Sequence, residues 1–166
     1  MPKNKRQAVD IMQFRQCLSK FTTGVTVITC SDPEGGKYGM TVNSFSSVSL
    51  EPPLILWNIA KDSDSLQAFL DAKLFAINIL AAGQKQESSY FAKSENNIFD
   101  GIDHLLSDEG VPLLKDTLAC LECCTYQIHE SGDHYIVVGE VTAFRSEEVE
   151  PLVFYDGGYE SLKLDK

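Results

Sequence analysis

Residues 25–43 read VTVITCSDPEGGKYGMTVN, and this stretch decides the fold class. Its first five residues are Val, Thr or Ile, the β-branched side chains that favour strands. Residues 32–36, DPEGG, combine Asp, Pro and Gly, which is typical of a turn. The chain then returns in a second strand-like run over residues 38–43. The stretch therefore predicts a β-hairpin of two antiparallel strands.

The elements on either side extend this pattern. Before the hairpin, Ile11, Phe14, Leu18 and Phe21 recur at helical spacing, and Asp10 can cap the helix that they predict. Beyond it, the sequence predicts strands at residues 54–59, 74–80, 118–129, 134–144 and 151–155, helices at 65–72 and 84–92, and mostly loop over 93–115. Strict alternation of strand and helix is missing, which argues against a parallel doubly wound sheet. We expect a mainly β fold, an antiparallel barrel with a few peripheral helices, in a single domain over residues 1–166.

The chain is acidic, and this argues against two classes of partner. Its 166 residues carry 14 Lys and Arg against 24 Asp and Glu, which gives a formal net charge of −10 at pH 7. A nucleic-acid binder needs a basic surface, and an anionic membrane repels an acidic one, so neither partner is expected. The charge is uneven, because residues 1–83 hold eight basic and seven acidic side chains, whereas residues 84–166 hold six and 17. An anionic cofactor is therefore expected to bind against the first half.

The five cysteines indicate a reducing compartment, because an odd number cannot pair completely within one chain. No targeting segment or membrane span is evident, so we expect a cytoplasmic protein. Cys120 and Cys123 have the C-x-x-C spacing of zinc ligands and redox dithiols. They lie in a strand-like run, where side chains three residues apart face opposite sides. We therefore expect core cysteines and no metal site.

Three features have the chemistry to bind a polar ligand. Residues 41–49 are rich in hydroxyl groups that suit a polar ring edge or a phosphate, and the alternative is an edge strand with a polar face. His134 follows the sequence SGD at a hairpin tip, where it is either an accessible ligand-binding group or simply a turn residue. Lys61, Ser63 and Ser65 precede a predicted helix, and the free N–H groups of a helix start favour anions.

Taken together, these segments resemble the short flavin reductases that serve as reductase components of two-component flavin monooxygenases. The resemblance rests on the block GMTVNSFSSVSLEPP at residues 39–53, and on GDH at 132–134 followed by VGEV at 138–141. Shorter pieces agree in the same order, namely FTTGVTVIT at residues 21–29, FAINIL at 75–80 and LACLEC at 118–123. The similar region runs from about residue 10 to about residue 160.

The resemblance implies a homodimeric, FMN-binding split β-barrel, antiparallel and Greek-key-like. FMN is the expected cofactor, FAD is the alternative, and NADH is favoured over NADPH because no arginine cluster is evident. The implied flavin-binding residues are Thr41, Val42, Asn43, Ser44, Ser46 and Ser47 along the ring, and Lys61, Ser63 and Ser65 at the phosphate. Gly132, His134 and Tyr159 are implied on the NAD(P)H side.

The implied function is an NAD(P)H:FMN oxidoreductase that transfers a hydride from nicotinamide to flavin and supplies reduced flavin to a partner monooxygenase. This chemistry needs ring stacking and polarisation rather than an acid–base pair, so His134 is expected to position the nicotinamide. Many members of the family have a basic residue where this chain has Gly158. That difference supports an alternative, a carrier or sensor that binds FMN without turnover. A thiol or metal protein built on Cys120 and Cys123 is a third hypothesis.

Overall fold

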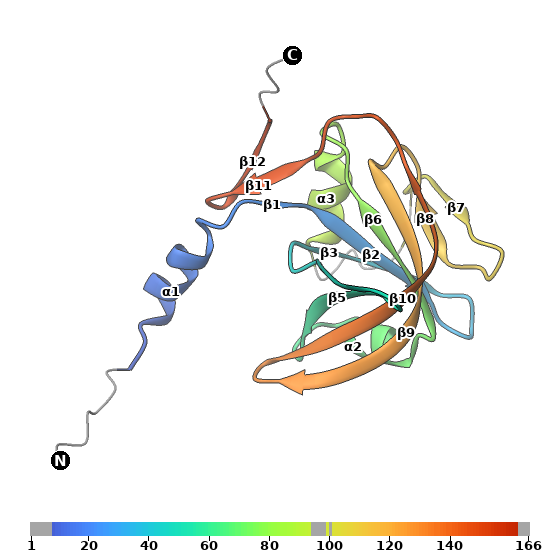
Figure 1. Cartoon of the computed structure of the whole chain (residues 1–166), viewed down its shortest axis with the longest axis horizontal. Coiled ribbons are helices and arrows are strands. Elements are labelled where there is room, and N and C mark those ends of the chain that lie inside the picture. The colour runs from blue at the N-terminus through green and yellow to red at the C-terminus, as the bar shows by residue number, and fades with distance from the viewer. Residues whose placement is uncertain (1–7, 94–98, 100, 163–166) are drawn as a thin grey trace.

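A curled antiparallel sheet forms the body of the molecule in the computed structural model, which describes residues 8–93, 99 and 101–162 (Figure 1). Seven strands lie in the order β3-β2-β6-β9-β10-β5-β4. Their bounds are β2 Thr26–Ser31, β3 Lys37–Val42, β4 Ser46–Leu50, β5 Pro53–Ala60, β6 Leu74–Ile79, β9 Ala119–Ser131 and β10 His134–Ser146. The predicted hairpin is β2–β3, in which Thr26 pairs with Val42 and Ser31 with Lys37.

Smaller elements surround this sheet. The three-stranded sheet consists of β1 Thr23–Gly24, β11 Val153–Tyr155 and β12 Gly158–Glu160, and a separate hairpin consists of β7 His104–Leu106 and β8 Pro112–Leu114. The helices are α1 Ile11–Leu18, α2 Leu66–Asp71 and α3 Lys85–Phe91. Figure 1 shows that α1 extends away from the body beside the β1–β11–β12 sheet. No helix in the described part of the chain is long and apolar enough to cross a membrane.

The two edges of the large sheet approach each other at one point. Strands β3 and β4 follow each other in the chain but stand at opposite ends of the sheet order, and no ladder joins them among the described pairings. Between them, Ser44 Oγ accepts a hydrogen bond from the Asn58 backbone N–H of β5 at 3.0 Å. The prediction of a mainly β, antiparallel barrel with peripheral helices is confirmed, and the barrel is split at this seam.

Two hydrophobic clusters explain why β2 is buried on both faces. Ile28 lies in the cluster that contains Trp57, whereas Val27 lies in the cluster that contains Phe91 of α3. In the first cluster, the Trp57 ring packs edge-on against Phe69 of α2, with ring centroids 5.3 Å apart. Both faces of β2 contact apolar side chains. Its β-branched sequence therefore lacks the alternation of polar and apolar residues that is typical of a half-exposed strand.

One close approach in this core requires glycine. A Cβ atom at Gly139 of β10 would lie 2.4 Å from Cζ of Phe75. Phe75 also packs edge-on against Trp57, with ring centroids 6.0 Å apart. A larger residue at position 139 would displace an aromatic ring at the centre of the core.

The predicted elements are found with three differences. The serine-rich run predicted as either a ligand surface or an edge strand contains the edge strand β4. The segment predicted as mostly loop over residues 93–115 contains β7 and β8, although positions 94–98 and 100 lie outside the described residues. A further short strand, β12, follows β11 through a turn at Asp156 and Gly157, both with positive φ.

Candidate functional site

A cavity of about 530 Å³ lies beside the end of β3. Its volume is within the range of small-molecule sites. The lining residues come from β3 and the segment that follows it, from β5, and from the tip of the β9–β10 hairpin; they are Met40, Thr41, Val42, Asn43, Ser44, Asn58, Ala60, Ser131, His134 and Ile136. Four of the six residues predicted along the flavin ring, Thr41 to Ser44, and the predicted His134 therefore share one cavity.

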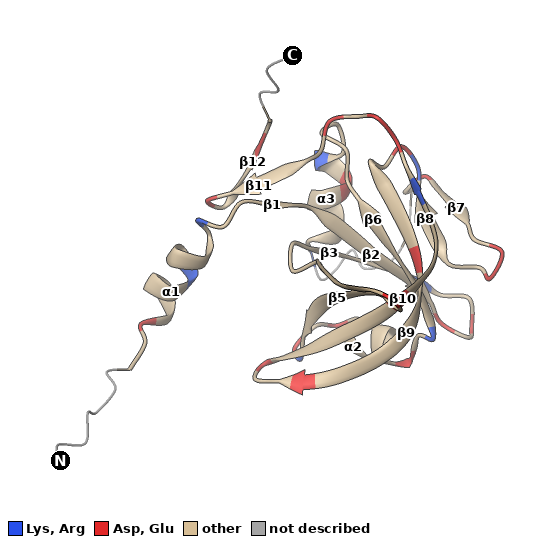
Figure 2. Cartoon of the chain, viewed as in Figure 1, with Lys and Arg blue, Asp and Glu red and all other residues tan. Residues whose placement is uncertain are grey.

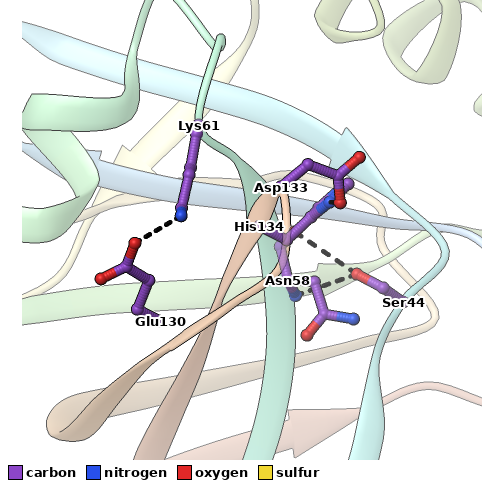
Figure 3. Close-up of polar contacts among 6 residues, drawn as sticks. All are labelled: Ser44, Asn58, Lys61, Glu130, Asp133 and His134. Atoms are coloured by element: carbon purple, nitrogen blue, oxygen red, sulfur yellow. Dashed lines mark hydrogen bonds and ion pairs between the residues drawn. The ribbon is translucent and has the colours of Figure 1, made fainter.

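Hydrogen bonds fix the wall formed by the end of β3. Thr41 Oγ1 donates to the carbonyl oxygen of Ser88 in α3 at 2.8 Å. The carbonyl oxygen of Val42 accepts a hydrogen bond from Thr26 Oγ1 at 2.9 Å. Ser44 is held against the Asn58 backbone of β5 (Figure 3). The wall is therefore attached to neighbouring strands and to α3, which suits a surface that must hold a flat ring in one orientation.

His134 is placed by a tight turn and by its neighbour. Ser131 pairs with His134, so Gly132 and Asp133 form a two-residue turn, and Gly132 has φ +64°. Such a positive φ at the first turn position favours glycine. His134 Nδ1 lies 2.8 Å from Asp133 Oδ1 (Figure 3). This hydrogen bond is the main cause that lowers the pKa of Asp133. An ionised carboxylate can only accept, so His134 Nδ1 is the donor in this hydrogen bond.

Lys61 follows Ala60 of the cavity wall, but its side chain does not line the cavity and is already paired. Its Nζ is 2.5 Å from Glu130 Oε1, and this contact is the main cause that raises the Lys61 pKa and lowers that of Glu130. Its backbone N–H donates to the carbonyl oxygen of Asp133 at 2.9 Å. Lysine and arginine are sparse on the body of the molecule (Figure 2). Lys61 is therefore a cation one residue from the cavity wall, paired with a carboxylate that does not line the cavity.

The two serines predicted beside Lys61 face each other. Ser63 Oγ and Ser65 Oγ are 3.3 Å apart, and Ser65 is almost fully buried. Ser65 stands at the N-cap of α2 without a side-chain capping bond, and α2 has only six residues. The intervening Asp62 and Asp64 are exposed. The hydroxyl of Ser63 is thus the more accessible of the two for a ligand.

The remaining predicted residues lie elsewhere. Ser46 and Ser47 are exposed on β4 and do not line the cavity. Tyr159 lines a second cavity of about 210 Å³, with Val25, Thr41, Val42, Asn43, Ser88, Ala92 and Phe154. Its hydroxyl is 2.7 Å from Ser88 Oγ. The two cavities share Thr41, Val42 and Asn43, so the end of β3 separates Tyr159 from His134 rather than bringing them together.

Five lining residues were not predicted from the sequence, and two of them, Asn58 and Ser131, are polar. Asn58 is a polar residue in the otherwise apolar strand β5, and its side-chain amide makes no hydrogen bond to the described residues. A polar residue within this apolar run is the signal from which Asn58 could have been predicted. Ser131 enters the cavity because it pairs with His134 across the turn, and this placement depends on the strand register.

The two cysteines with C-x-x-C spacing are buried in the core. Cys120 and Cys123 lie in different hydrophobic clusters, which agrees with side chains on opposite faces of β9. Burial raises the pKa of Cys120 to about 11 and that of Cys123 to about 12. Both are therefore protonated at neutral pH and lack the thiolate needed for metal binding or dithiol exchange.

Comparison with known families decides between the hypotheses for this cavity. Residues 18–163 match the flavin reductase like domain. The chain belongs to this family. One relative of this flavin reductase-like protein is the FMN reductase (NADH) SmoA of Agrobacterium fabrum (strain C58), 48% identical over 146 residues, which are 88% of this chain and 83% of that protein.

Two further relatives agree with the flavin reductase-like assignment. The reductase component of the flavin-dependent trigonelline monooxygenase of Acinetobacter baylyi is 42% identical over 90% of this chain, which spans 48% of that longer protein. The solved structure of the Streptomyces globisporus NADH:FAD oxidoreductase SgcE6, in complex with NAD and FAD fragments, is 36% identical with a TM-score of 0.89. It is matched over 96% of this chain and 98% of its own. The family and the fold predicted from the sequence are thereby confirmed.

Proposed function

We propose that this chain is an NAD(P)H-dependent flavin reductase that uses FMN, with FAD as the alternative, and NADH as its reductant. The observation that carries the proposal is the 530 Å³ cavity in which the end of β3 meets His134. When bound there, the flavin would accept a hydride from the nicotinamide. The names of the relatives, an FMN reductase (NADH) and an NADH:FAD oxidoreductase, support the same activity.

The residues of the cavity fit a flavin ring. Thr41, Val42, Asn43 and Ser44 would bind one side and edge of the ring through side chains and backbone, and exposed Ser46 and Ser47 would extend this surface along β4. The Asn58 Oδ1 is buried without a hydrogen-bond partner among the described residues. As an acceptor, it is available for an N–H donor of the flavin ring.

The other predicted residues would hold the phosphate and the nicotinamide. We assign the FMN phosphate to Lys61 and Ser63, with Ser65 holding Ser63 in place. Gly132 shapes the turn that presents His134, whose bond to Asp133 fixes its ring beside the cavity. Tyr159 would act from the neighbouring cavity, across the shared wall. The names of two relatives, an FMN reductase (NADH) and an NADH:FAD oxidoreductase, favour NADH over NADPH.

Stopped-flow spectroscopy tests the activity directly. Mixing the FMN-loaded protein with NADH under anaerobic conditions should bleach the visible absorbance of the flavin, and NADPH should act more slowly. The carrier or sensor alternative, which Gly158 supports, predicts FMN binding with NADH oxidation at the background rate. An absence of bleaching with both nucleotides would therefore favour the carrier and contradict the reductase.

A flavin-dependent monooxygenase is the proposed partner, supplied with reduced flavin by diffusion. The support is the relative from Acinetobacter baylyi, which is the reductase component of such an enzyme. The substrate of that partner is not encoded in this chain. A single domain over residues 1–166 and a cytoplasmic location also stay predictions, the latter supported by five free cysteines.

We further propose a homodimer, in which α1 packs against a second copy. Three apolar side chains of α1, Ile11, Phe14 and Leu18, have the spacing of one helix face and are 49–65% exposed, and Phe21 just beyond the helix is 78% exposed. No residue of α1 is buried within the chain (Figure 1). An amphipathic helix without a covered apolar face usually packs on another surface.

The double substitution Phe14→Glu with Leu18→Glu should convert the dimer to a monomer, because it places two charges in the proposed contact. Light scattering coupled to size-exclusion chromatography measures the mass. Gln16→Glu, on the same helix but outside the apolar face, is the control and should stay dimeric. A wild-type protein of 18.4 kDa in solution would contradict the dimer.

A further inference from the structure

The Lys61 ammonium lies between two groups of the β9–β10 hairpin. Its Nζ is 2.5 Å from Glu130 Oε1 and 5.5 Å from the centroid of the Tyr135 ring. Glu130 and Tyr135 are direct partners across the two strands, so the lysine lies over one cross-strand pair. Figure 3 shows Lys61 pointing toward Glu130, on the other side of the hairpin tip from Asp133 and His134.

The Lys61–Glu130 ion pair is exposed, so it stabilises the fold only weakly and another anion can replace Glu130. The side chain of Glu130 is 66% exposed, and that of Lys61 is 34% exposed. Ion pairs at this exposure contribute little to stability because water solvates both charges when they separate. The Glu130 carboxylate makes no other side-chain hydrogen bond within the described part of the chain. A stronger anion can therefore displace it without disturbing other contacts.

The charges around this lysine oppose a second anion. Glu130 neutralises Lys61, and the exposed Asp62, Asp64 and Asp133 lie within three residues of one or the other. A flavin phosphate that approaches the pair meets a net negative environment until Glu130 moves away. A ligand without a phosphate does not meet this barrier, since it makes no contact with Lys61.

We propose that Glu130 competes with the flavin phosphate for Lys61, and thereby limits how tightly phosphorylated flavins bind. This inference rests on the proposed placement of the FMN phosphate at Lys61. It makes Glu130 a residue that sets affinity and flavin specificity without touching the reacting ring. Weakened phosphate binding suits a reductase that must release its reduced flavin to a second enzyme.

Binding measurements on Glu130→Gln test the competition. Removal of this charge should lower the Kd for FMN by about three- to tenfold, the range expected when an exposed carboxylate no longer opposes a nearby anion. The Kd for riboflavin, which has no phosphate, should stay within about twofold. Glu148→Gln removes the same charge from an exposed residue after β10 that does not pair with Lys61, and it should change neither value. Flavin fluorescence quenching at fixed ionic strength measures the Kd values of FMN and riboflavin for each variant.

Lys61→Ala, alone and combined with Glu130→Gln, shows whether the competition or the phosphate placement is wrong. In a Lys61→Ala background, Glu130→Gln should change the FMN Kd by less than about twofold, because the contested cation is gone. If Lys61→Ala weakens FMN selectively but Glu130→Gln gives no gain, the phosphate site stands and the competition is wrong. If Lys61→Ala weakens FMN and riboflavin equally, the phosphate placement itself is wrong. An undiminished Glu130→Gln gain in the double variant would also overturn competition for Lys61.

Discussion

Replacement of Asn78 by alanine should lower the free energy of unfolding by about 3–5 kcal/mol, because the side chain is the centre of a buried polar network. Asn78 is fully buried on β6. Its Nδ2 donates to the carbonyl oxygen of Val27 at 3.0 Å and to Thr29 Oγ1 at 3.1 Å. Its Oδ1 accepts from the Leu114 backbone N–H at 2.9 Å, and from Cys120 Sγ at 3.6 Å.

These bonds attach β8 to three strands, β2, β6 and β9, that are already neighbours in the large sheet. Val27 and Thr29 belong to β2, Leu114 to β8 and Cys120 to β9. Thr29 Oγ1 in turn donates to the carbonyl oxygen of Pro112 at 2.5 Å. Alanine at position 78 would leave several of these buried groups without partners, and each unsatisfied group costs about 1–3 kcal/mol.

Urea denaturation followed by the fluorescence of Trp57, the single tryptophan, measures the effect. Asn58→Ala is a matched control, because that amide makes no hydrogen bond within the described residues. It should change the free energy of unfolding by less than about 1 kcal/mol. A loss below about 1 kcal/mol for Asn78→Ala would show that water or side-chain rearrangement satisfies the network.

The sequence predicted the strands with clear β-branched or apolar runs, including β6, whose partners β2 and β9 are distant in the chain. The β2–β3 hairpin followed from β-branched residues around a turn, and β9–β10 from two long runs around a glycine turn. Short strands were missed because their pairing, rather than their composition, makes them strands. β8 contains Pro112 and lies in a stretch rich in Asn, Asp and Gly, yet its three residues are buried against the core.

The candidate site was predicted where the motif is contiguous, and missed where it depends on strand register. Residues 41–44 follow one another and line one cavity with His134, as the resemblance implied. The partner of Lys61 was hidden, because Glu130 belongs to the acidic second half of the chain and reaches position 61 only through the β5–β10–β9 pairing. The near-neutral charge of residues 1–83 was therefore a poor guide to the surroundings of Lys61, because the fold brings a carboxylate from the acidic second half next to it.

Lys61→Ala should raise the Kd for FMN by about 10- to 30-fold, within the range for a hydrogen bond to a charged group. The Kd for riboflavin, which lacks the phosphate, should rise by less than about twofold. The expected loss lies near the lower end of the range because wild-type Lys61 must first leave Glu130. FAD carries its phosphates in a dinucleotide linkage, so the ratio of the FMN and FAD effects also indicates which flavin the site fits.

Lys115→Ala provides a matched control for this last comparison. Lys115 is also partly exposed and pairs with Asp103 at 3.8 Å, but it lines a different cavity, together with Gln84 and Asp103. Its replacement changes the net charge by the same amount and should leave both flavin Kd values within about twofold. Higher salt should reduce the difference in the Kd for FMN between wild type and Lys61→Ala, since screening weakens exposed charge interactions. Equal losses for FMN and riboflavin would place the phosphate away from Lys61, because only a phosphate contact distinguishes these two ligands.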